Sequence, residues 1–340
     1  MTVEAYDLFA GAGGWDVAAE LIGIHAHGVE NMKAARESRD AASLSTVHDD
    51  VWTFDTTTPR RVAGLIASPP CQTFSLAGKG SGRKALDDVL TAIKEEAWSD
   101  LDELRSFGER VGDDRTALVL TPLAYAHRLF PKWIAWEQVP TVLPVWEACA
   151  EVLSSWGYST WTGNLQAEQY GVPQTRKRAF LLASMGREVG RPTPTHSKYY
   201  PRSPEKLDEG VQKWVSMAEA LLLSDAWDPA AFPELGTRAQ VSNYSAGGDS
   251  STRGVRGLDQ PSSTVTSKSM RWLPEWRYCT TVSGQNAPDR VRVTVQEAGI
   301  LQSFPADYPW QGAKGKQYLQ VGNAVPPLLA EAVLREVTGL

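Results

Sequence analysis

The sequence predicts an α/β fold with a mostly parallel sheet, together with a smaller, irregular second domain. Short apolar runs typical of buried strands alternate with helical apolar spacing up to about residue 185, which favours parallel strands joined by crossover helices. A glycine turn at 11–14 joins the first expected strand to the first helix, as in nucleotide-binding α/β domains. From 186 to about 290 the chain is rich in Pro, Ser, Thr and Gly.

The expected elements follow in order along the chain. Strands are predicted at 4–9, 26–30, 62–67, 133–136, 158–164 and 179–184, and helices at 15–22, 116–129, 142–156, 214–223, 294–302 and 326–337. Because regular helical spacing returns after 290, the α/β domain is expected to be discontinuous, with 1–185 joined by 291–340. The second domain then comprises 186–290.

Length and composition limit the class of protein. With 340 residues, 42% of them hydrophobic, the chain can bury a large core. It shows no apolar run of membrane-spanning length and no leader pattern, so we expect a soluble, cytoplasmic protein. Three widely separated cysteines argue against a disulfide framework. Five scattered histidines lack metal-ligand spacing, so no metal site is predicted.

The net charge of −6 combines two segments of opposite sign. Residues 87–114 hold ten acidic and three basic side chains, whereas 238–292 hold eight basic and four acidic ones. Local patches decide whether a surface attracts phosphate, so the second segment is the candidate for binding a polyanion. The acidic segment has helical apolar spacing, and we expect a helical hairpin or lid inserted at about 85–112.

The run SPPCQTFS at 68–75 directly follows an apolar, strand-like stretch. Ligands in parallel α/β folds bind outside the carboxyl ends of the strands, and two prolines restrict the backbone before the cysteine. We therefore interpret Cys71 as a nucleophile whose pKa basic neighbours would lower. Cys149, on the apolar face of an expected helix, is interpreted as a packing residue. The glycine-rich run after Cys71 suits closure over a polyanion or a solvated linker, and it carries Lys79, Arg83 and Lys84.

Two acidic residues follow the glycine turn at positions that suit a nucleotide. Small residues and a helix start let a ligand approach free backbone N–H groups. Glu30 suits a pair of ribose hydroxyls, and Asp50 suits an adenine amino group. Each acid alone could equally be a solvated turn residue, but the turn and both acids together favour a nucleotide site.

Glu137 ends a strongly apolar strand beside Trp136. Desolvation there would raise the pKa of its carboxyl and make it a proton donor; an exposed acid at the strand end is the alternative. The run QTRKR at 174–178 precedes the next apolar strand. Its alternate arginines would point to one side of an extended chain, and solvated surface cations are the alternative.

In this order, the motifs resemble those of the DNA cytosine-5 methyltransferases over essentially the whole chain. The resemblance rests on DLFAGAGG at 7–14, PCQ at 70–72, EQV at 137–139, QTRKR at 174–178, RVT at 292–294, Glu297, LQSFP at 301–305 and QVGNAVP at 320–326. It implies a Rossmann-like S-adenosylmethionine-dependent methyltransferase domain and a target-recognition domain at 186–290. The first would be the catalytic and cofactor-binding domain.

The resemblance implies that a cysteine thiolate adds to carbon 6 of cytosine and so activates carbon 5 for methylation. Cys71 matches that nucleophile, and Glu137 matches the acid that engages ring nitrogen 3 and the exocyclic amine. Arg178 matches the arginine at the ring carbonyl, and Arg176 the one that braces the site. S-adenosylmethionine would supply the methyl group, and the base would be flipped out because it cannot be reached inside a duplex.

The resemblance also implies the binding residues and partners. The cofactor site would comprise Phe9, Gly11, Gly13, Glu30, Asp50, Val51, Pro70, Asn323 and Val325. Double-stranded DNA would meet Lys79, Arg83, Lys84, Arg253, Arg256, Lys268 and Arg271, any of which could touch phosphate alone. The enzyme would act as a monomer, either without a partner or with a cognate restriction endonuclease.

Three departures from the family pattern bear on function. Gln138 stands where the family usually has asparagine, which leaves its brace on the cysteine loop open. Asn31 stands where many members place an aromatic residue beside the cofactor. The acidic segment lengthens the chain after Cys71, and because DNA repels acidic groups we expect 85–112 to fold away from the DNA cleft, against a partner or the second domain.

A sequence-specific DNA methyltransferase acting on carbon 5 of cytosine is the leading hypothesis. A transfer-RNA methyltransferase on the same fold is an alternative, although the long basic recognition region fits DNA better. A DNA-binding protein with little catalytic activity is another, in which Gln138 and the insertion have replaced turnover. A dinucleotide-dependent dehydrogenase would fit the fold but has no use for the Cys71 and Asn323 motifs.

Overall fold

The structure, a computed structural model, describes residues 3–54, 62–70, 80–112, 114–224, 239–245, 253–268, 270–273 and 291–340, without the side chains of 3, 80–84, 114, 243–245, 253 and 273. The chain divides into two compact units, each described by itself. Unit 1 comprises Met1–Leu165, Lys177–Thr193 and Ala330–Leu340, and unit 2 comprises Gln166–Arg176 and Pro194–Leu329.

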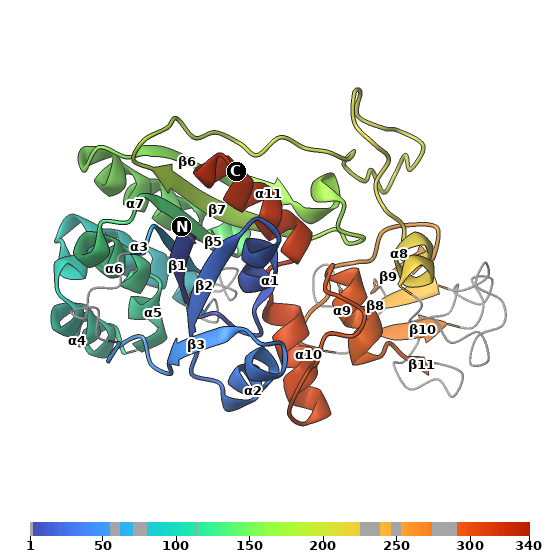
Figure 1. The fold of residues 1–340 in the computed structure, drawn as a ribbon, viewed down its shortest axis with the longest axis horizontal. Helices are drawn as coiled ribbons and strands as arrows, with labels where there is room; N and C mark the ends of the chain where they lie inside the picture. Colours follow the sequence, from blue (N-terminus) through green and yellow to red (C-terminus); the bar gives the residue numbers. More distant parts are fainter. Residues whose placement is uncertain are drawn as a thin grey trace. The chain divides into compact units, whose positions relative to one another are not determined.

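Unit 1 is built around a seven-stranded sheet (Figure 1) with the strand order β3-β2-β1-β4-β5-β7-β6. The strands are β1 (Val3–Leu8), β2 (Ile24–Val29), β3 (Ser45–His48), β4 (Gly64–Ala67), β5 (Trp133–Gln138), β6 (Ser159–Gln166) and β7 (Lys177–Ser184). The first five pair in parallel, and β7 pairs antiparallel with β5. The predicted α/β fold with a mostly parallel sheet is confirmed.

The order of the strands reverses between β1 and β4. The chain moves outward from β1 to β2 and β3, and then returns to β4 on the other side of β1. In open α/β sheets, ligands bind in the crevice outside the carboxyl ends of the strands at such a reversal. The glycine turn after β1 and the run 68–70 after β4 both lie at this point.

Helices cover both faces of this sheet. They are α1 (Gly14–Leu21), α2 (Lys33–Ala41), α3 (Gly80–Lys94), α4 (Leu101–Val111), α5 (Asp114–Leu118), α6 (Thr121–Leu129) and α7 (Leu143–Ser155), with short 3₁₀ turns η1 (Ala97–Ser99) and η2 (Pro140–Val142). Trp15 of α1 packs edge-to-face on Phe180 of β7, whereas Leu181 joins a core cluster with Leu123 of α6 and Val145 of α7. Consecutive strand residues point to opposite faces, so α1 and this cluster lie on opposite sides of the sheet.

The helices of unit 1 differ from the expectation in two places. The helix predicted at 116–129 is two helices, α5 and α6, and a proline in the first turn of α6 suits a helix start. Helix α2 was not predicted. Its buried positions are Ala35, Ser38 and Arg39, so it lacks the large apolar side chains that make helical periodicity visible.

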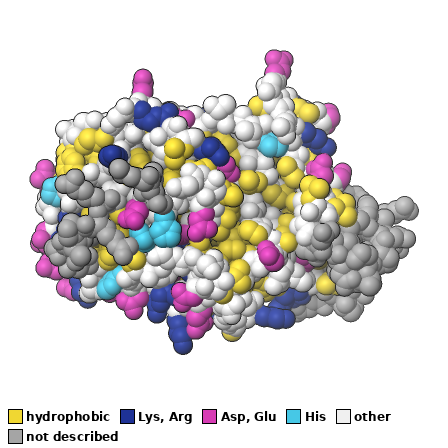
Figure 2. Space-filling view, viewed as in Figure 1, with side chains coloured by type: hydrophobic (Ala, Val, Ile, Leu, Met, Phe, Trp, Pro, Cys, Tyr) yellow, Lys and Arg dark blue, Asp and Glu magenta, His cyan; other side chains and the backbone are white. Residues whose placement is uncertain are grey.

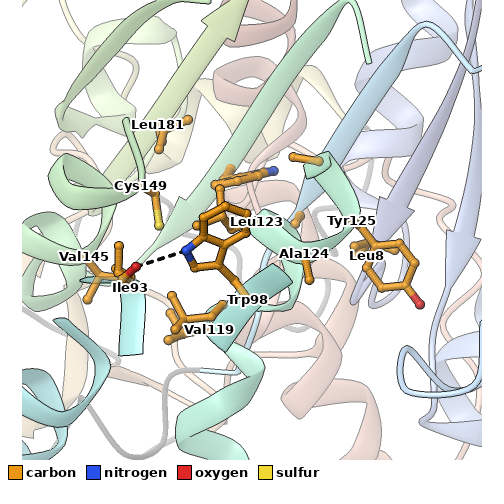
Figure 3. Packing of buried hydrophobic residues seen from close by; sticks show 14 of the residues in the cluster. Leu8, Ile93, Trp98, Val119, Leu123, Ala124, Tyr125, Val145, Cys149 and Leu181 are labelled. Atoms are coloured by element: carbon orange, nitrogen blue, oxygen red, sulfur yellow. Dashed lines mark hydrogen bonds between the residues drawn. The ribbon is translucent and has the colours of Figure 1, made fainter. Parts of the chain in front are cut away.

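The acidic insertion packs into the core of unit 1. Trp98 of η1 is 5% exposed, and its Nε1 donates to the carbonyl of Ile93 at 3.1 Å (Figure 3). The same ring lies 5.3 Å from the rings of both His127 and Trp156. The apolar face of the insertion completes the core of unit 1, so the expectation that the insertion packs against the second domain was wrong.

The acidic side chains of the insertion lie on its outer face. Asp100 caps α4 by accepting from the N–H groups of Asp102 and Glu103, and these bonds lower the pKa of its carboxyl. Exposed Asp102, Glu103 and Glu109 follow on α4, and Figure 2 shows Asp and Glu side chains along the edge of the molecule where α4 lies.

Unit 2 holds a small antiparallel sheet with the strand order β11-β10-β8-β9. Its elements are η3 (Ala167–Tyr170), α8 (Met217–Leu223), β8 (Ala239–Ser245), β9 (Arg253–Gly257), β10 (Arg271–Leu273), β11 (Val291–Arg292), α9 (Val295–Leu301) and α10 (Lys314–Asn323), and α11 (Pro327–Thr338) leads back into unit 1. These four strands and α10 were not predicted. Among the described residues, no helix has both the length and the apolar character needed to cross a membrane.

Candidate active site and cofactor pocket

Cys71 and Lys79 lie outside the described residues, as do the side chains of Arg83, Lys84 and Arg253. The chain that leads to Cys71 is described up to Pro70. Ser68 continues the pairing of β4 with β1, since its N–H donates to the carbonyl of Leu8 at 3.1 Å. Its Oγ accepts a hydrogen bond from Trp15 Nε1 at 3.0 Å. The chain before the cysteine is therefore fixed to β1 and to α1.

Gln138 braces the same segment from β5. This side chain is 3% exposed. Its Nε2 donates to the carbonyl of Pro69, and its Oε1 accepts from the N–H of Val139. The longer amide therefore makes the contact that the sequence left open.

Glu137 and Arg178 form an ion pair at the ends of neighbouring strands. The Nε of Arg178 lies 3.1 Å from Oε1 of Glu137, with the two side chains 16% and 6% exposed. The register pairs Ala67 of β4 with Trp136 of β5, so Glu137 is level with Ser68. The structure thus brings a buried carboxylate and a guanidinium to the strand edge from which the cysteine loop departs.

Cys149, interpreted as a packing residue, points into the hydrophobic cluster beside Leu181 (Figure 3). It is fully buried, and burial raises the pKa of its thiol. A thiol held neutral in this way is a poor nucleophile, so the interpretation as a packing residue is confirmed.

The glycine turn is held by the predicted ribose acid. Glu30 accepts from the N–H of Gly11 at 2.8 Å with one oxygen and from the N–H of Met32 at 2.7 Å with the other. Burial raises the pKa of Glu30, against the opposing effect of these two bonds. Phe9, Gly11 and Gly13 all have positive φ angles, and a Cβ at Gly11 would meet open space. The turn therefore leaves its backbone accessible on that side.

A second acidic loop completes this region. Asp50 accepts from the N–H of Trp52 at 2.9 Å. Tyr125 of α6 donates its hydroxyl to the carbonyls of Val51 and Phe54, at 2.5 and 3.0 Å. The loop after β3 is thereby anchored to α6.

A cavity of about 70 Å³ lies between these two loops and is lined by Phe9, Val29, Glu30, Asn31, Asp49, Asp50, Val51, Trp52 and Leu118. It unites four of the predicted cofactor residues. Sequence reasoning missed Asp49, Trp52 and Leu118, although an aromatic residue directly after Asp50 and Val51 was a usable signal. Carboxylates and aromatic rings are groups that suit ribose hydroxyls and a purine, so the residues fit a nucleoside, which would have to displace part of the lining.

A buried cluster of charged residues comprises Asp7 and Asp16, which lie on either side of the glycine turn in the sequence, and Arg39 of α2. Arg39 donates to both oxygens of Asp16 at 2.7 and 2.6 Å, with both side chains almost fully buried. Burial and the charge of Asp16 hold the pKa of Asp7 well above its usual range. A Cβ at Gly28 would come within 2.2 Å of the Arg39 guanidinium, which explains the glycine.

Arg176, in unit 2, braces the Asn323 motif. It is 2% exposed, and its Nη atoms donate to the carbonyls of Val265, Gly322 and Ala324 at 3.1 Å each. Asn323 is exposed between two of these carbonyls, and Val325 is buried. A Cβ at Gly322 would lie 2.2 Å from backbone atoms of Thr266 and Ser267, so only glycine fits there.

The predicted DNA contacts of unit 2 differ in their surroundings. Lys268 is exposed, and Arg271 of β10 is half-buried. Arg256 of β9 is half-buried, and its Nη1 donates to Thr175 Oγ1 at 2.7 Å and to the carbonyls of Pro261 and Ser262 at 2.9 and 2.8 Å. Across the described residues, no three His, Cys, Asp or Glu side chains gather in a way that could hold a metal ion.

Comparison with known proteins gives concordant matches. The model of the family described as "C-5 cytosine-specific DNA methylase" matches residues 3–93 and 104–339, so residues 94–103 within the acidic insertion are left unmatched. The type II methyltransferase M1.HphI of Haemophilus parahaemolyticus is 29% identical over 371 residues, covering 99% of this chain and 87% of that protein. The type II methyltransferase M.DdeI of Desulfomicrobium norvegicum is 26% identical and covers 98% of this chain and 88% of its own.

Solved structures share the fold. A protein assigned as a DNA modification methyltransferase encoded within an E. coli prophage superposes with a TM-score of 0.62 at 17% identity, covering 99% of both chains. S. pombe Dnmt2 methyltransferase gives 0.60 at 14% identity, covering 99% of this chain and 98% of its own. Because the family model matches nearly the whole chain, the protein belongs to the C-5 cytosine-specific DNA methylases and is a DNA (cytosine-5)-methyltransferase.

Proposed function

We propose that this chain is a sequence-specific type II methyltransferase that uses Cys71 as its nucleophile and S-adenosylmethionine as its methyl donor. One observation carries the assignment of residues. The Glu137–Arg178 pair lies level with Ser68, at the strand edge from which the cysteine loop departs. A flipped cytosine that reached Cys71 would meet both groups.

The ion pair suits the edge of a cytosine ring. Ring nitrogen 3 and the ring carbonyl are neighbouring atoms, and the pair offers a carboxyl and a guanidinium side by side, 3.1 Å apart. Addition of the Cys71 thiolate to carbon 6 moves negative charge toward these ring atoms. Arg178 would stabilise that charge at the carbonyl, and Glu137 would hold or deliver a proton at nitrogen 3. Carbon 5 then becomes nucleophilic and would take up the methyl group, after which loss of its proton with departure of Cys71 would complete the cycle.

The cavity in unit 1 is the proposed site for the adenosine part of the cofactor. Glu30 would accept from the ribose hydroxyls, Asp50 from the adenine amino group, and Phe9 and Val51 would contact the ring. When bound, S-adenosylmethionine supplies an electrophilic methyl group. Gly11, Gly13, Pro70, Asn323 and Val325 are proposed cofactor residues from their motifs.

Double-stranded DNA is the proposed macromolecular partner, bound through the basic segment of unit 2 and the glycine-rich run after Cys71. Lys268, Arg271 and Arg253 are the candidates in unit 2, and Lys79, Arg83 and Lys84 are those after Cys71. Named type II methyltransferases among the relatives support a role beside a restriction endonuclease. A monomer located with DNA in the cytoplasm, and the division into 1–185 with 291–340 and 186–290, stay predictions.

Methyl transfer from radiolabelled S-adenosylmethionine to DNA tests this proposal. We expect incorporation by the wild type and its complete loss in Cys71→Ser, because a hydroxyl cannot add to carbon 6 as a thiolate does. Cys149→Ser is the matched control and should keep activity. Bisulfite sequencing of DNA from expressing cells gives the recognition sequence. Unchanged activity in Cys71→Ser would overturn the assignment.

A further inference from the structure

In unit 2, the segment that carries Arg176 is joined to the loop after β9 by a series of short hydrogen bonds. Ser262 donates its N–H to the carbonyl of Pro173 at 2.9 Å, and Thr175 donates its N–H to the carbonyl of Ser262 at 2.8 Å. Thr264 donates its hydroxyl to the carbonyl of Thr175 at 2.7 Å. Both the N–H and the C=O of Thr175 are therefore hydrogen-bonded to this loop. Thr175 directly precedes Arg176 in the chain and lies three residues before Arg178.

Arg256 adds the side-chain link to this junction. It extends from β9, and its Nη1 is shared among the hydroxyl of Thr175 and the carbonyls of Pro261 and Ser262, at 2.7, 2.9 and 2.8 Å. Its guanidinium carbon lies 5.1 Å from the centre of the Tyr199 ring. One charged group thus links β9, the loop after β9 and the segment that carries Arg176.

The surroundings of Arg256 are those of an internal link. An arginine that positions DNA points its N–H groups at phosphate oxygens, whereas Nη1 of Arg256 donates to protein oxygens and its plane lies over an aromatic ring. Buried Glu168, whose Oε2 has no hydrogen-bond partner among the described residues, lies in its electrostatic field. The charge of Arg256 lowers the pKa of this carboxyl, against the larger effect of burial.

We propose that Arg256 is a positioning residue. It fixes Thr175, and thereby the segment that carries Arg176 and Arg178, to β9. This inference rests on the proposed function, in which Arg178 touches the base and Arg176 braces the site. It replaces the expectation that Arg256 contacts DNA. Small displacements of a group that orients a reacting base cost about 10²-fold in rate, so this role predicts a defect in chemistry and not in DNA affinity.

The test separates DNA binding from chemistry in Arg256→Met. We expect the single-turnover methylation rate at saturating DNA to fall 10- to 100-fold, while the Kd for DNA changes less than threefold and its dependence on salt is unchanged. Arg256→Lys keeps the charge but lacks the planar donors, so it should remain slow. Thr175→Val removes the acceptor and should slow the reaction too, and the double variant should be no slower than the slower single one.

Two controls make the outcome decisive. Arg202→Met removes an exposed arginine of the same unit and should match the wild type in both measurements. Lys268→Met should weaken DNA binding and lower the salt slope by about 1. The proposal is overturned if Arg256→Met behaves like Lys268→Met and Arg256→Lys restores binding, or if Thr175→Val leaves the rate unchanged. If Arg256→Met does not fold, Thr175→Val alone decides. Absence of methylation by the wild type would instead overturn the proposed function.

Discussion

The two arginines of the run 174–178 are held in different ways. Arg178 starts a strand, and its partner Glu137 ends the neighbouring strand, so sheet register alone brings the ion pair together. Arg176 lies in unit 2 and is held by carbonyls of the loop after β9 and of the C-terminal end of α10, both distant in sequence. The proposed base-binding corner therefore depends on regular strand pairing, whereas the segment that carries Arg176 depends on individual side-chain bonds. The two regions should therefore respond differently to substitution.

The largest expected effect is at the corner formed by register. Glu137→Gln keeps the shape and the strand but removes the acid, and general acid catalysis contributes roughly 10²- to 10⁴-fold. We expect the single-turnover rate to fall by that factor, with little change in thermal unfolding. Rapid-quench kinetics with saturating DNA measures it. A fall of less than tenfold would show that Glu137 is not the acid.

Gly322→Ala should break the bracing segment instead. The new Cβ would lie 2.2 Å from the backbone of Thr266 and Ser267, and backbone cannot move aside as a flexible side chain can. We expect a loss of roughly 1 to 3 kcal/mol of stability, as in overpacked cores, and weaker cofactor binding. Urea unfolding and calorimetric titration with S-adenosylhomocysteine check this. Gly315→Ala, where a Cβ would meet open space, is the control that should change neither.

Buried Glu168 should make the stability of unit 2 depend on pH. Burial raises the pKa of Glu168 from 4.5 to about 7, so its ionisation opposes folding. Its contribution is fully favourable below pH 4.5 and is lost as the pH rises through about 7. Glu168→Gln should therefore gain roughly 2 to 3 kcal/mol relative to the wild type between pH 4.5 and 8. Urea unfolding at both pH values measures this, and a relative loss at pH 8 would mean that Arg256 outweighs burial.

The smallest expected effect is at the brace on the cysteine loop. Gln138→Asn shortens the amide that donates to the Pro69 carbonyl. A neutral hydrogen bond contributes about 1 kcal/mol, so we expect an approximately five- to tenfold slower formation of the covalent adduct. Gln138→Leu should be slower still. Equal rates in all three proteins would mean that the brace does not position Cys71.

The site residues that could be predicted from the sequence are those placed by regular secondary structure. Glu137 lies near the end of β5 and Glu30 directly follows β2, and both positions could be expected from apolar runs alone. Trp52 was missed because its role depends on a loop anchored by Tyr125, which is distant in sequence. The apolar face of the insertion was expected, but its packing against His127 and Trp156 depends on tertiary contacts.

Charge in a sequence also does not show what a side chain bonds. Arg256 lies in a basic segment and was expected on DNA, and its Nη1 donates to a threonine hydroxyl and two carbonyls. The strands β8 to β11 were missed, and two of them, β10 and β11, hold only three and two residues. Pairing between distant segments, which periodicity cannot reveal, fixes both features.

Covalent capture of DNA tests directly whether Cys71 is the nucleophile. A duplex carrying 5-fluorocytosine at the recognition site cannot lose its carbon 5 substituent, so an adduct formed by the enzyme with S-adenosylmethionine should persist. Mass spectrometry of the digested adduct should find the DNA on the peptide that contains Cys71 and leave Cys149 unmodified. An adduct on another residue, or methyl transfer without any adduct, would contradict the account.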